Sequence, residues 1–410
     1  MTHPQTITKT AAVPEPDRGF PLWPLLATLA MQTLSTGAAY SFPAVAPAVA
    51  KDLGIDGALV GFFISTVYGV GIVSALFSPG FVHRYGGVRV SQTVLLMTLV
   101  MLATAAIGSV ASIALGAILM GFAYGAAAPS STHLLVPRTP RGTLNLVLSL
   151  RQIGVPLGGV LAGLVMPPLT LAYGWRAALL IEMAPVLVLM LLLQIPRASW
   201  DRDRDPGRTI INANLLRPLG LLRANAAVRR LAFVSFVYSG LQLCFIAFMT
   251  VHLTTKAGFS LVHAGQALAV YQVGGVVSRP IWGWMADHWL AARWLLGLQG
   301  VIACGAAFLA GTFDPSWSRI GVFMVCAVGG ATASGFTGIA YAEWARLGGE
   351  RRTEATGLGA ATMFAGVLVL PSLMSVVVTV QGGYEAAYTL VGLLALVAGV
   401  LVAFQRGPGA

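Results

Sequence analysis

The sequence has little charge, and the charge that it has is mostly basic. Only 10% of its 410 residues are Asp, Glu, Lys or Arg, whereas 57% are hydrophobic. Soluble domains carry about 25% charged residues, so this composition excludes an ordinary soluble domain and favours a membrane protein. The net charge of +11 would indicate nucleic-acid binding only if the basic residues clustered on one folded surface.

Cysteine is also scarce, and the residues of an active site are missing. Cys244, Cys304 and Cys326 all lie inside apolar runs, where they resemble small buried hydrophobes, not a disulfide framework. The sequence shows no nucleophile with a neighbouring base, no cluster of metal ligands and no phosphate-binding loop. We therefore predict that the protein is not an enzyme and holds no metal or cofactor.

Only one long polar stretch interrupts the hydrophobic sequence. A helix needs about 20 mostly apolar residues to span a membrane, and twelve segments meet that need. We predict an all-α membrane protein of twelve transmembrane helices in two pseudo-symmetric six-helix bundles. The predicted spans are 22–47, 57–82, 90–109, 111–134, 145–170, 175–195, 229–253, 262–286, 293–313, 317–341, 354–379 and 384–404.

The polar stretch divides the chain into two halves. We predict a cytosolic N-terminal tail (1–21), an N-terminal bundle (22–195), a cytosolic linker (196–228), a C-terminal bundle (229–404) and a cytosolic C-terminal tail (405–410). The polar N-terminus lacks the pattern of a signal peptide.

The distribution of basic residues predicts the orientation. Most of the 25 Lys and Arg residues fall on one side of the membrane if both termini are cytosolic. Because basic residues mark the cytosolic side, we predict a multi-pass protein of the cytoplasmic (inner) membrane with both termini inside. The Arg-rich linker is then a solvated topology signal, and no nucleic-acid partner is expected.

Two similar stretches lie in matching places of the two halves. They are Gly274–Arg293, GGVVSRPIWGWMADHWLAAR, and Val70–Arg89, VGIVSALFSPGFVHRYGGVR. A repeat spaced by half the chain indicates a duplicated architecture.

These features resemble the major facilitator superfamily of secondary transporters. That family carries the pattern Gly-x-x-x-Asp-Arg-x-Gly-x-Arg after its second and eighth helices. In the first half, His83 stands where the Asp is expected. The resemblance implies a cytosolic gating latch and two halves that rock about a midplane site, giving alternating access. The matching residues are Gly283, Asp287 and Arg293 in the second half and Arg84 and Arg89 in the first.

Two arginines lie inside predicted spans, Arg279 in the eighth and Arg151 in the fifth. A charge within a span costs about 2.5–3.5 kcal/mol on insertion scales, so each requires a reason. The resemblance implies that these two helices pack together, and we hypothesise that the arginines form an anion-binding pair. Arg279-Pro280 is also similar to helix eight of monocarboxylate porters, although those usually place an acid where this chain has Gly275.

Structural roles remain open for the charged residues within the spans. Arg279 could bond helix ends or Glu343, and Arg151 could extend to the cytosol. Glu182 is the one carboxylate well inside a span, and a structural role is favoured because its helix is usually peripheral in this family.

Polar and aromatic residues at mid-depth complete the predicted substrate site. Each could instead make only an interhelical hydrogen bond. They include Gln32, Tyr124, Gln242, Tyr271 and Gln272, of which Gln32, Tyr124 and Gln242 have the strongest case because the resemblance places their helices around the cavity.

We predict a secondary active transporter that moves a small organic anion, such as a carboxylate, by symport. Its partners would be a small-molecule substrate and the lipid bilayer, and it would act as a monomer. An exporter of neutral or amphipathic compounds, a carrier for a flavin or nucleobase, and a receptor without transport activity are the alternatives. The sequence leaves direction and coupling ion open.

Overall fold

The computed structural model describes residues 20–139, 144–207, 210, 220–348 and 352–404, and this part of the chain is almost wholly helical. No strand occurs in these residues, so the all-α prediction is confirmed. The elements are α1 (Leu22–Leu53), η1 (Gly57–Leu59), α2 (Val60–Tyr85), α3 (Gly87–Ala106), α4 (Val110–Leu135), η2 (Val136–Arg138), α5 (Leu144–Gln152), α6 (Gly154–Tyr173), α7 (Trp175–Leu192), α8 (Gln194–Trp200), α9 (Gly220–Ala224), α10 (Ala226–Thr255), α11 (Leu261–His288), α12 (Ala292–Gly311), α13 (Arg319–Gly329), η5 (Gly330–Ser334), α14 (Thr337–Gly348), α15 (Arg352–Gln381) and α16 (Glu385–Ala403).

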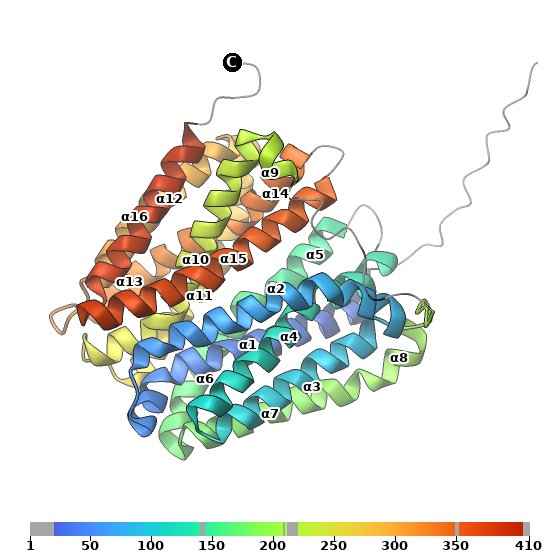
Figure 1. Cartoon of the computed structure of the whole chain (residues 1–410), viewed down its shortest axis with the longest axis horizontal. Helices are drawn as coiled ribbons and strands as arrows, with labels where there is room; N and C mark the ends of the chain where they lie inside the picture. The colour runs from blue at the N-terminus through green and yellow to red at the C-terminus, as the bar shows by residue number, and fades with distance from the viewer. Residues whose placement is uncertain (1–19, 140–143, 208–209, 211–219, 349–351, 405–410) are drawn as a thin grey trace, which may run out of the picture.

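The long helices form two groups that follow the two halves of the chain (Figure 1). In the first half, α1 packs on α6, α2 on α4, and α3 on α4 and α7. In the second half, α10 packs on α15, α12 on α16, and α11 on α13. The groups meet along two seams, α2 against α15 and α6 against α11.

Ten of the helical segments that the structure describes are long and apolar enough to cross a membrane. The other two predicted spans are α1 and α11, which are also long, at 32 and 28 residues. These two helices carry Gln32 and Arg279, so polar side chains interrupt their apolar sequence.

Two predicted spans are broken in the structure. The fifth divides at Ile153 into α5 and α6. Pro156 explains this break, because it has no N–H to donate to the carbonyl of Gln152 and its ring crowds that carbonyl. The tenth span is interrupted by a π-turn, Gly330–Ser334, between α13 and α14. Such turns disturb the regular helical bonding and occur often at functional sites.

The linker was expected to be solvated throughout, and that expectation is wrong for Asp201. Its side chain is 5% exposed and accepts hydrogen bonds from the backbone N–H groups of Val88 (2.8 Å) and Arg89 (3.0 Å). Those N–H groups begin α3 and have no partner within the helix. Gly86 makes room for the carboxylate with a φ of 98°, since a Cβ there would collide with Asp201. This part of the linker therefore belongs to the first bundle.

The two halves are joined near the turn between α1 and α2, which we call the α1–α2 end. Ser375 Oγ donates to the carbonyl of Ala58 (2.6 Å), and Thr250 Oγ1 donates to the carbonyl of Pro43 (2.5 Å). A Cβ on Gly61 would lie 2.5 Å from the carbonyl oxygen of Pro371. These contacts leave no side-chain space between α2 and α15 at this end.

Candidate substrate site

Arg151 is the penultimate residue of α5, two residues before the break at Ile153, and its side chain is only 4% exposed. Its Nη2 donates to Gln32 Oε1 (2.5 Å), and its Nη1 donates to Gln152 Oε1 (3.0 Å). Gln32 is held in turn, because its amide nitrogen donates to Thr36 Oγ1 (2.9 Å) one turn further along α1. The side chain does not extend to the cytosol, so that alternative is wrong.

Arg279 lies on α11 and is half-buried. Its Nε and Nη2 donate to the carbonyl and the hydroxyl of Ser334, each at 3.3 Å. Ser334 is the last residue of the π-turn, so the break in the tenth span presents these two oxygens. Glu343, the alternative partner, instead pairs with Arg346, whose Nε lies 2.7 Å from Glu343 Oε2.

Residues predicted from the second half gather around the same π-turn. Gln242 Nε2 donates to Ser334 Oγ (3.3 Å), and the hydroxyl of Tyr271 donates to the carbonyl of Gln242 (3.4 Å). Gln272 lies apart from them, on the face of α11 that packs against Gly159 of α6. The prediction that the fifth and eighth spans pack together is therefore confirmed.

Tyr124 connects the two arginines. Its phenol lies within electrostatic range of both the Arg151 and the Arg279 guanidinium groups. Both guanidinium groups therefore lie in the neighbourhood of Tyr124. Whether they bind substrate stays a prediction, as do the roles of Gln32, Gln242 and Tyr271.

Neither arginine has a carboxylate partner in the part of the chain that the structure describes. Among the described residues no ion pair includes Arg151 or Arg279. Arg279 uses two of its five N–H groups on Ser334. Arg151 Nε is buried with no partner among those residues. Buried charges are normally paired, so two unpaired guanidinium groups in the membrane form a site that is suited to an anion.

A cluster of tyrosines beside the arginines was missed in the sequence. The hydroxyls of Tyr40 and Tyr68 lie 3.3 Å apart, and Tyr68 donates to Tyr124 at 3.4 Å. Phe364 of the other half packs edge-on against Tyr68, with ring centroids 5.4 Å apart. The mid-depth criterion that selected Tyr124 applies equally to Tyr40 and Tyr68. The cluster gives the site an aromatic wall, in which the ring faces are apolar and the hydroxyl groups are polar.

The predicted gating residues are only partly described. The Asp287 side chain lies outside the described residues, and the latch stays a prediction. In the first half, Arg84 stacks over Tyr85 at 5.7 Å and Arg89 Nη1 donates to Gln92 (3.3 Å). In the second half, Arg293 stacks over Trp294 (5.6 Å), and a Cβ on Gly283 would touch nothing within 4 Å.

Asp201 supplies the carboxylate that the first-half motif lacks, since His83 stands in its place. It comes from the linker instead, at the start of α3. Burial raises the pKa of Asp201, while its two backbone hydrogen bonds oppose that shift. Sequence spacing alone could not have indicated this contact, because the partners are more than 100 residues apart.

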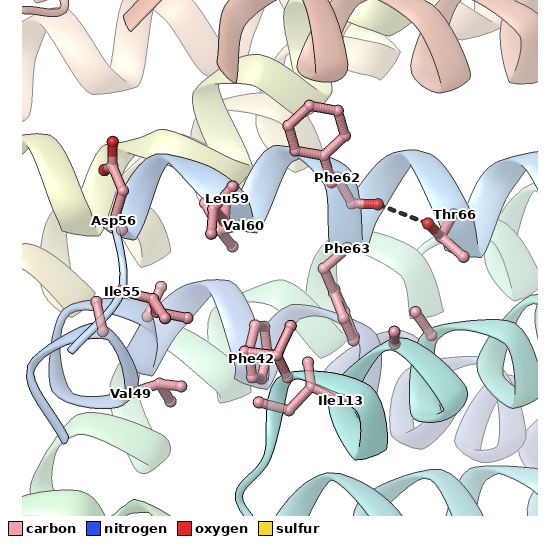
Figure 2. A pocket seen from close by; sticks show the side chains of 16 residues that line it. Phe42, Val49, Ile55, Asp56, Leu59, Val60, Phe62, Phe63, Thr66 and Ile113 are labelled. Carbon is pink, nitrogen blue, oxygen red and sulfur yellow. Dashed lines mark hydrogen bonds between the residues drawn. The ribbon is translucent and has the colours of Figure 1, made fainter. Parts of the chain in front are cut away.

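A cavity of about 250 Å³ lies at the α1–α2 end, away from both arginines (Figure 2). Phe42, Phe63 and Ile113 point into it from α1, α2 and α4. The charged residue in its lining is the acid Asp56, which accepts a hydrogen bond from the backbone N–H of Ala58 (2.9 Å). No basic side chain among the described residues lines the cavity. The cavity does not suit an anion, so the candidate site remains the region of the two arginines.

Two helical bundles that meet over buried charged side chains have the architecture of a membrane transporter. The chain belongs to the Major Facilitator Superfamily, whose family model matches residues 28–346. It is thus a multi-pass protein of the inner membrane, and the prediction of a transporter instead of an enzyme is confirmed. The twelve-span fold in two bundles is consistent with that family.

The solved structures support the fold. A bacterial homolog to the human lysosomal transporter Spinster, in an inward-facing and unoccupied conformation, matches with a TM-score of 0.71 and 14% sequence identity. The match covers 95% of this chain and 99% of that one. An inward-facing, occupied form of a bacterial Spinster homolog matches with a TM-score of 0.69, at 15% identity and over 93% and 96% of the chains.

Several transporters are similar in sequence. The 4-hydroxybenzoate transporter PcaK of Pseudomonas aeruginosa is 27% identical over 60% of this chain and 61% of its own length. PcaK of Acinetobacter baylyi is 25% identical over 71% of each chain. The gallate transporter of Pseudomonas putida is 25% identical, over 65% and 66%. The matches to the Pseudomonas proteins thus span less than two thirds of those relatives.

Proposed function

We propose that this protein is a secondary active transporter that carries a small organic carboxylate across the inner membrane by alternating access. The observation that carries the proposal is the pair of unpaired arginines, Arg151 and Arg279, beside Tyr124. A substrate carboxylate would supply the missing counter-charge, and a guanidinium can grip it through two parallel hydrogen bonds.

The aromatic wall favours an aromatic carboxylate. Tyr40, Tyr68 and Tyr124 offer ring faces and hydroxyls next to the arginines. The similar proteins named for 4-hydroxybenzoate and gallate support the same class, since both compounds are phenolic carboxylates. An apolar ring would pack on the tyrosines while its hydroxyl joins their hydrogen bonds.

The same proposal includes the orientation and the state. If both termini are cytosolic, the α1–α2 end faces outward, and the contacts of Ala58 with Ser375 and of Pro43 with Thr250 close the outer side. The bundles 22–195 and 229–404 would rock about the arginines, with residues 196–228 as their connection. We propose a monomer with no nucleic-acid partner.

Counterflow in proteoliposomes tests this function. Vesicles loaded with unlabelled 4-hydroxybenzoate should accumulate the labelled compound, whereas vesicles loaded with 4-hydroxybenzyl alcohol should not, because that analogue lacks the carboxylate. Arg279→Ala should abolish the exchange, and Arg319→Ala, an exposed arginine at the start of α13, should leave it unchanged. Exchange driven equally by the neutral analogue would overturn the assignment to an organic anion.

A further inference from the structure

Glu182 is a carboxyl group that the proposed substrate site does not use. It lies in the middle of α7, where that helix packs against α1. A Cβ on Gly37 would lie 3.6 Å from its Oε1, an ordinary contact distance, so the carboxyl lies against α1 at this glycine. Its other oxygen, Oε2, is buried and has no hydrogen-bond partner among the described residues.

The hydrogen bonds around Ser41 are best satisfied by a proton on Glu182. Ser41 Oγ lies 2.8 Å from both the carbonyl oxygen of Gly37 and Glu182 Oε1. A hydroxyl has one proton, and both neighbours are acceptors if Glu182 is ionised, so one contact would be unbonded. A protonated Glu182 satisfies both, because its carboxyl donates to Ser41 and Ser41 donates to Gly37.

The charged surroundings also favour the neutral carboxyl. The titratable residues on the helices packed against α7 are Tyr40, Lys51 and Asp52 on α1, Arg89 on α3, Tyr173 on α6 and Arg197 on α8, and α7 itself adds Arg176. Arg176 pairs with Asp52 at the α1–α2 end (2.7 Å), and Arg89 lies at the opposite end of the bundle. None of them is a counter-ion of Glu182, and an ionised group buried without one is costly.

The position of Glu182 connects it to the moving parts. Ser41 lies two residues before Pro43. The carbonyl of Pro43 accepts the hydrogen bond from Thr250 that closes the α1–α2 end. On the same helix, Gln32 lies about 14 Å from Ser41, at 1.5 Å per residue, and accepts a hydrogen bond from Arg151. A shift of α1 would therefore alter the closure, the arginine and the carboxyl together.

We propose that Glu182 is the proton-binding site that couples transport to the proton gradient. In the conformation closed at the α1–α2 end, the carboxyl holds its proton against Ser41. When α1 moves and that end opens, water reaches the carboxyl and the proton exchanges with that side of the membrane. One proton is taken up from that side while the α1–α2 end is open, is carried on the carboxyl while the end is closed, and is released to the opposite side before the end reopens, with no other bond made or broken. The coupling to an organic anion rests on the proposed function.

Infrared difference spectroscopy tests the proton site without any substrate. The wild-type protein should show the carbonyl stretch of a buried protonated carboxyl, and this band should be lost in Glu182→Gln. Glu385→Gln, an exposed carboxyl at the start of α16, should keep it. Glu182→Asp should keep the band and shift the pH at which it disappears. A band that persists in Glu182→Gln, or its absence from the wild type, would overturn the proposal.

Transport then tests the coupling. In proteoliposomes with an alkaline interior, the wild type should accumulate 4-hydroxybenzoate, and Glu182→Gln should lose this accumulation while counterflow exchange continues. Gradient-driven accumulation by Glu182→Gln at the wild-type level would show that the residue is structural. If the wild type transports no organic anion, the proposed function fails, while the infrared result still decides the proton site.

Discussion

At the scale of the residue, the two arginines are held in different ways. Arg151 is buried and bonded to two glutamine side chains, Gln32 and Gln152. Arg279 is half-buried, has two longer bonds to Ser334 and keeps N–H groups to spare. We infer that Arg279 grips the substrate carboxylate directly and that Arg151 contributes mainly positive potential.

Replacing Arg279 by lysine tests this division. Arg279→Lys keeps the charge but removes the planar fork, so carboxylate affinity should fall about tenfold or more, the equivalent of one charge-assisted hydrogen bond. Isothermal titration with 4-hydroxybenzoate measures the loss, and Arg319→Lys should bind as the wild type does. Undiminished affinity in Arg279→Lys would mean that charge alone suffices and that no fork is used.

Asp201 should contribute to stability. Asp201→Ala removes the acceptor of two N–H groups at the start of α3, and loss of such a cap costs about 1–2 kcal/mol. Denaturation in detergent measures the change. Asp205→Ala, an exposed residue of the same segment, should stay within about 0.5 kcal/mol of the wild type. Equal stability of the two variants would show that the cap contributes nothing.

At the scale of the element, the site is built where regular helix stops. Arg151 lies two residues before the break at Ile153 between α5 and α6, and Ser334 closes the π-turn between α13 and α14. The sequence predicted both spans but not the π-turn. Pro156 is compatible with a kink as well as a break, and a π-turn depends on neighbours such as Trp282, which donates to the carbonyl of Ala331 at 2.7 Å.

Restoring the helix at the first break should disturb the site. Pro156→Ala supplies the missing N–H to Gln152, so α5 and α6 can join and rotate Arg151 away from Gln32. We expect unchanged or higher thermal stability together with weaker binding of 4-hydroxybenzoate. Pro168→Ala, an exposed proline further along α6, is the control and should bind normally. Normal affinity in Pro156→Ala would show that the break does not position Arg151.

At the scale of the whole molecule, the sequence predicted much of the architecture and little of the detail. Hydropathy located the spans because lipid demands long apolar helices, and the two charges within helices identified Arg151 and Arg279. Asp201, Tyr40 and Tyr68 were missed, since their roles depend on contacts between distant segments. The closed end could not be predicted, because both states of a transporter share one sequence.

Closure at the α1–α2 end should be sensitive to Gly61. Gly61→Val would press a side chain onto Pro371 and Phe248, since the Cβ alone would lie 2.5 Å from the Pro371 carbonyl oxygen and 2.6 Å from Phe248 Cζ, and so hold the end open. Transport of 4-hydroxybenzoate should be lost while binding is retained. Gly305→Val, at a position on α12 where a Cβ meets nothing within 4 Å, should transport normally. Normal transport by Gly61→Val would contradict this closure.

The central claim is that the region of Arg151 and Arg279 holds an organic anion, and a thermal-shift measurement on purified protein tests it most directly. A ligand at 100 times its dissociation constant adds about 2.7 kcal/mol of apparent stability. We predict stabilisation of the wild type by 4-hydroxybenzoate, none by 4-hydroxybenzyl alcohol, and loss of the effect in an Arg279→Ala variant that is otherwise folded. Equal stabilisation by the neutral analogue, or an undiminished shift in Arg279→Ala, would contradict the claim.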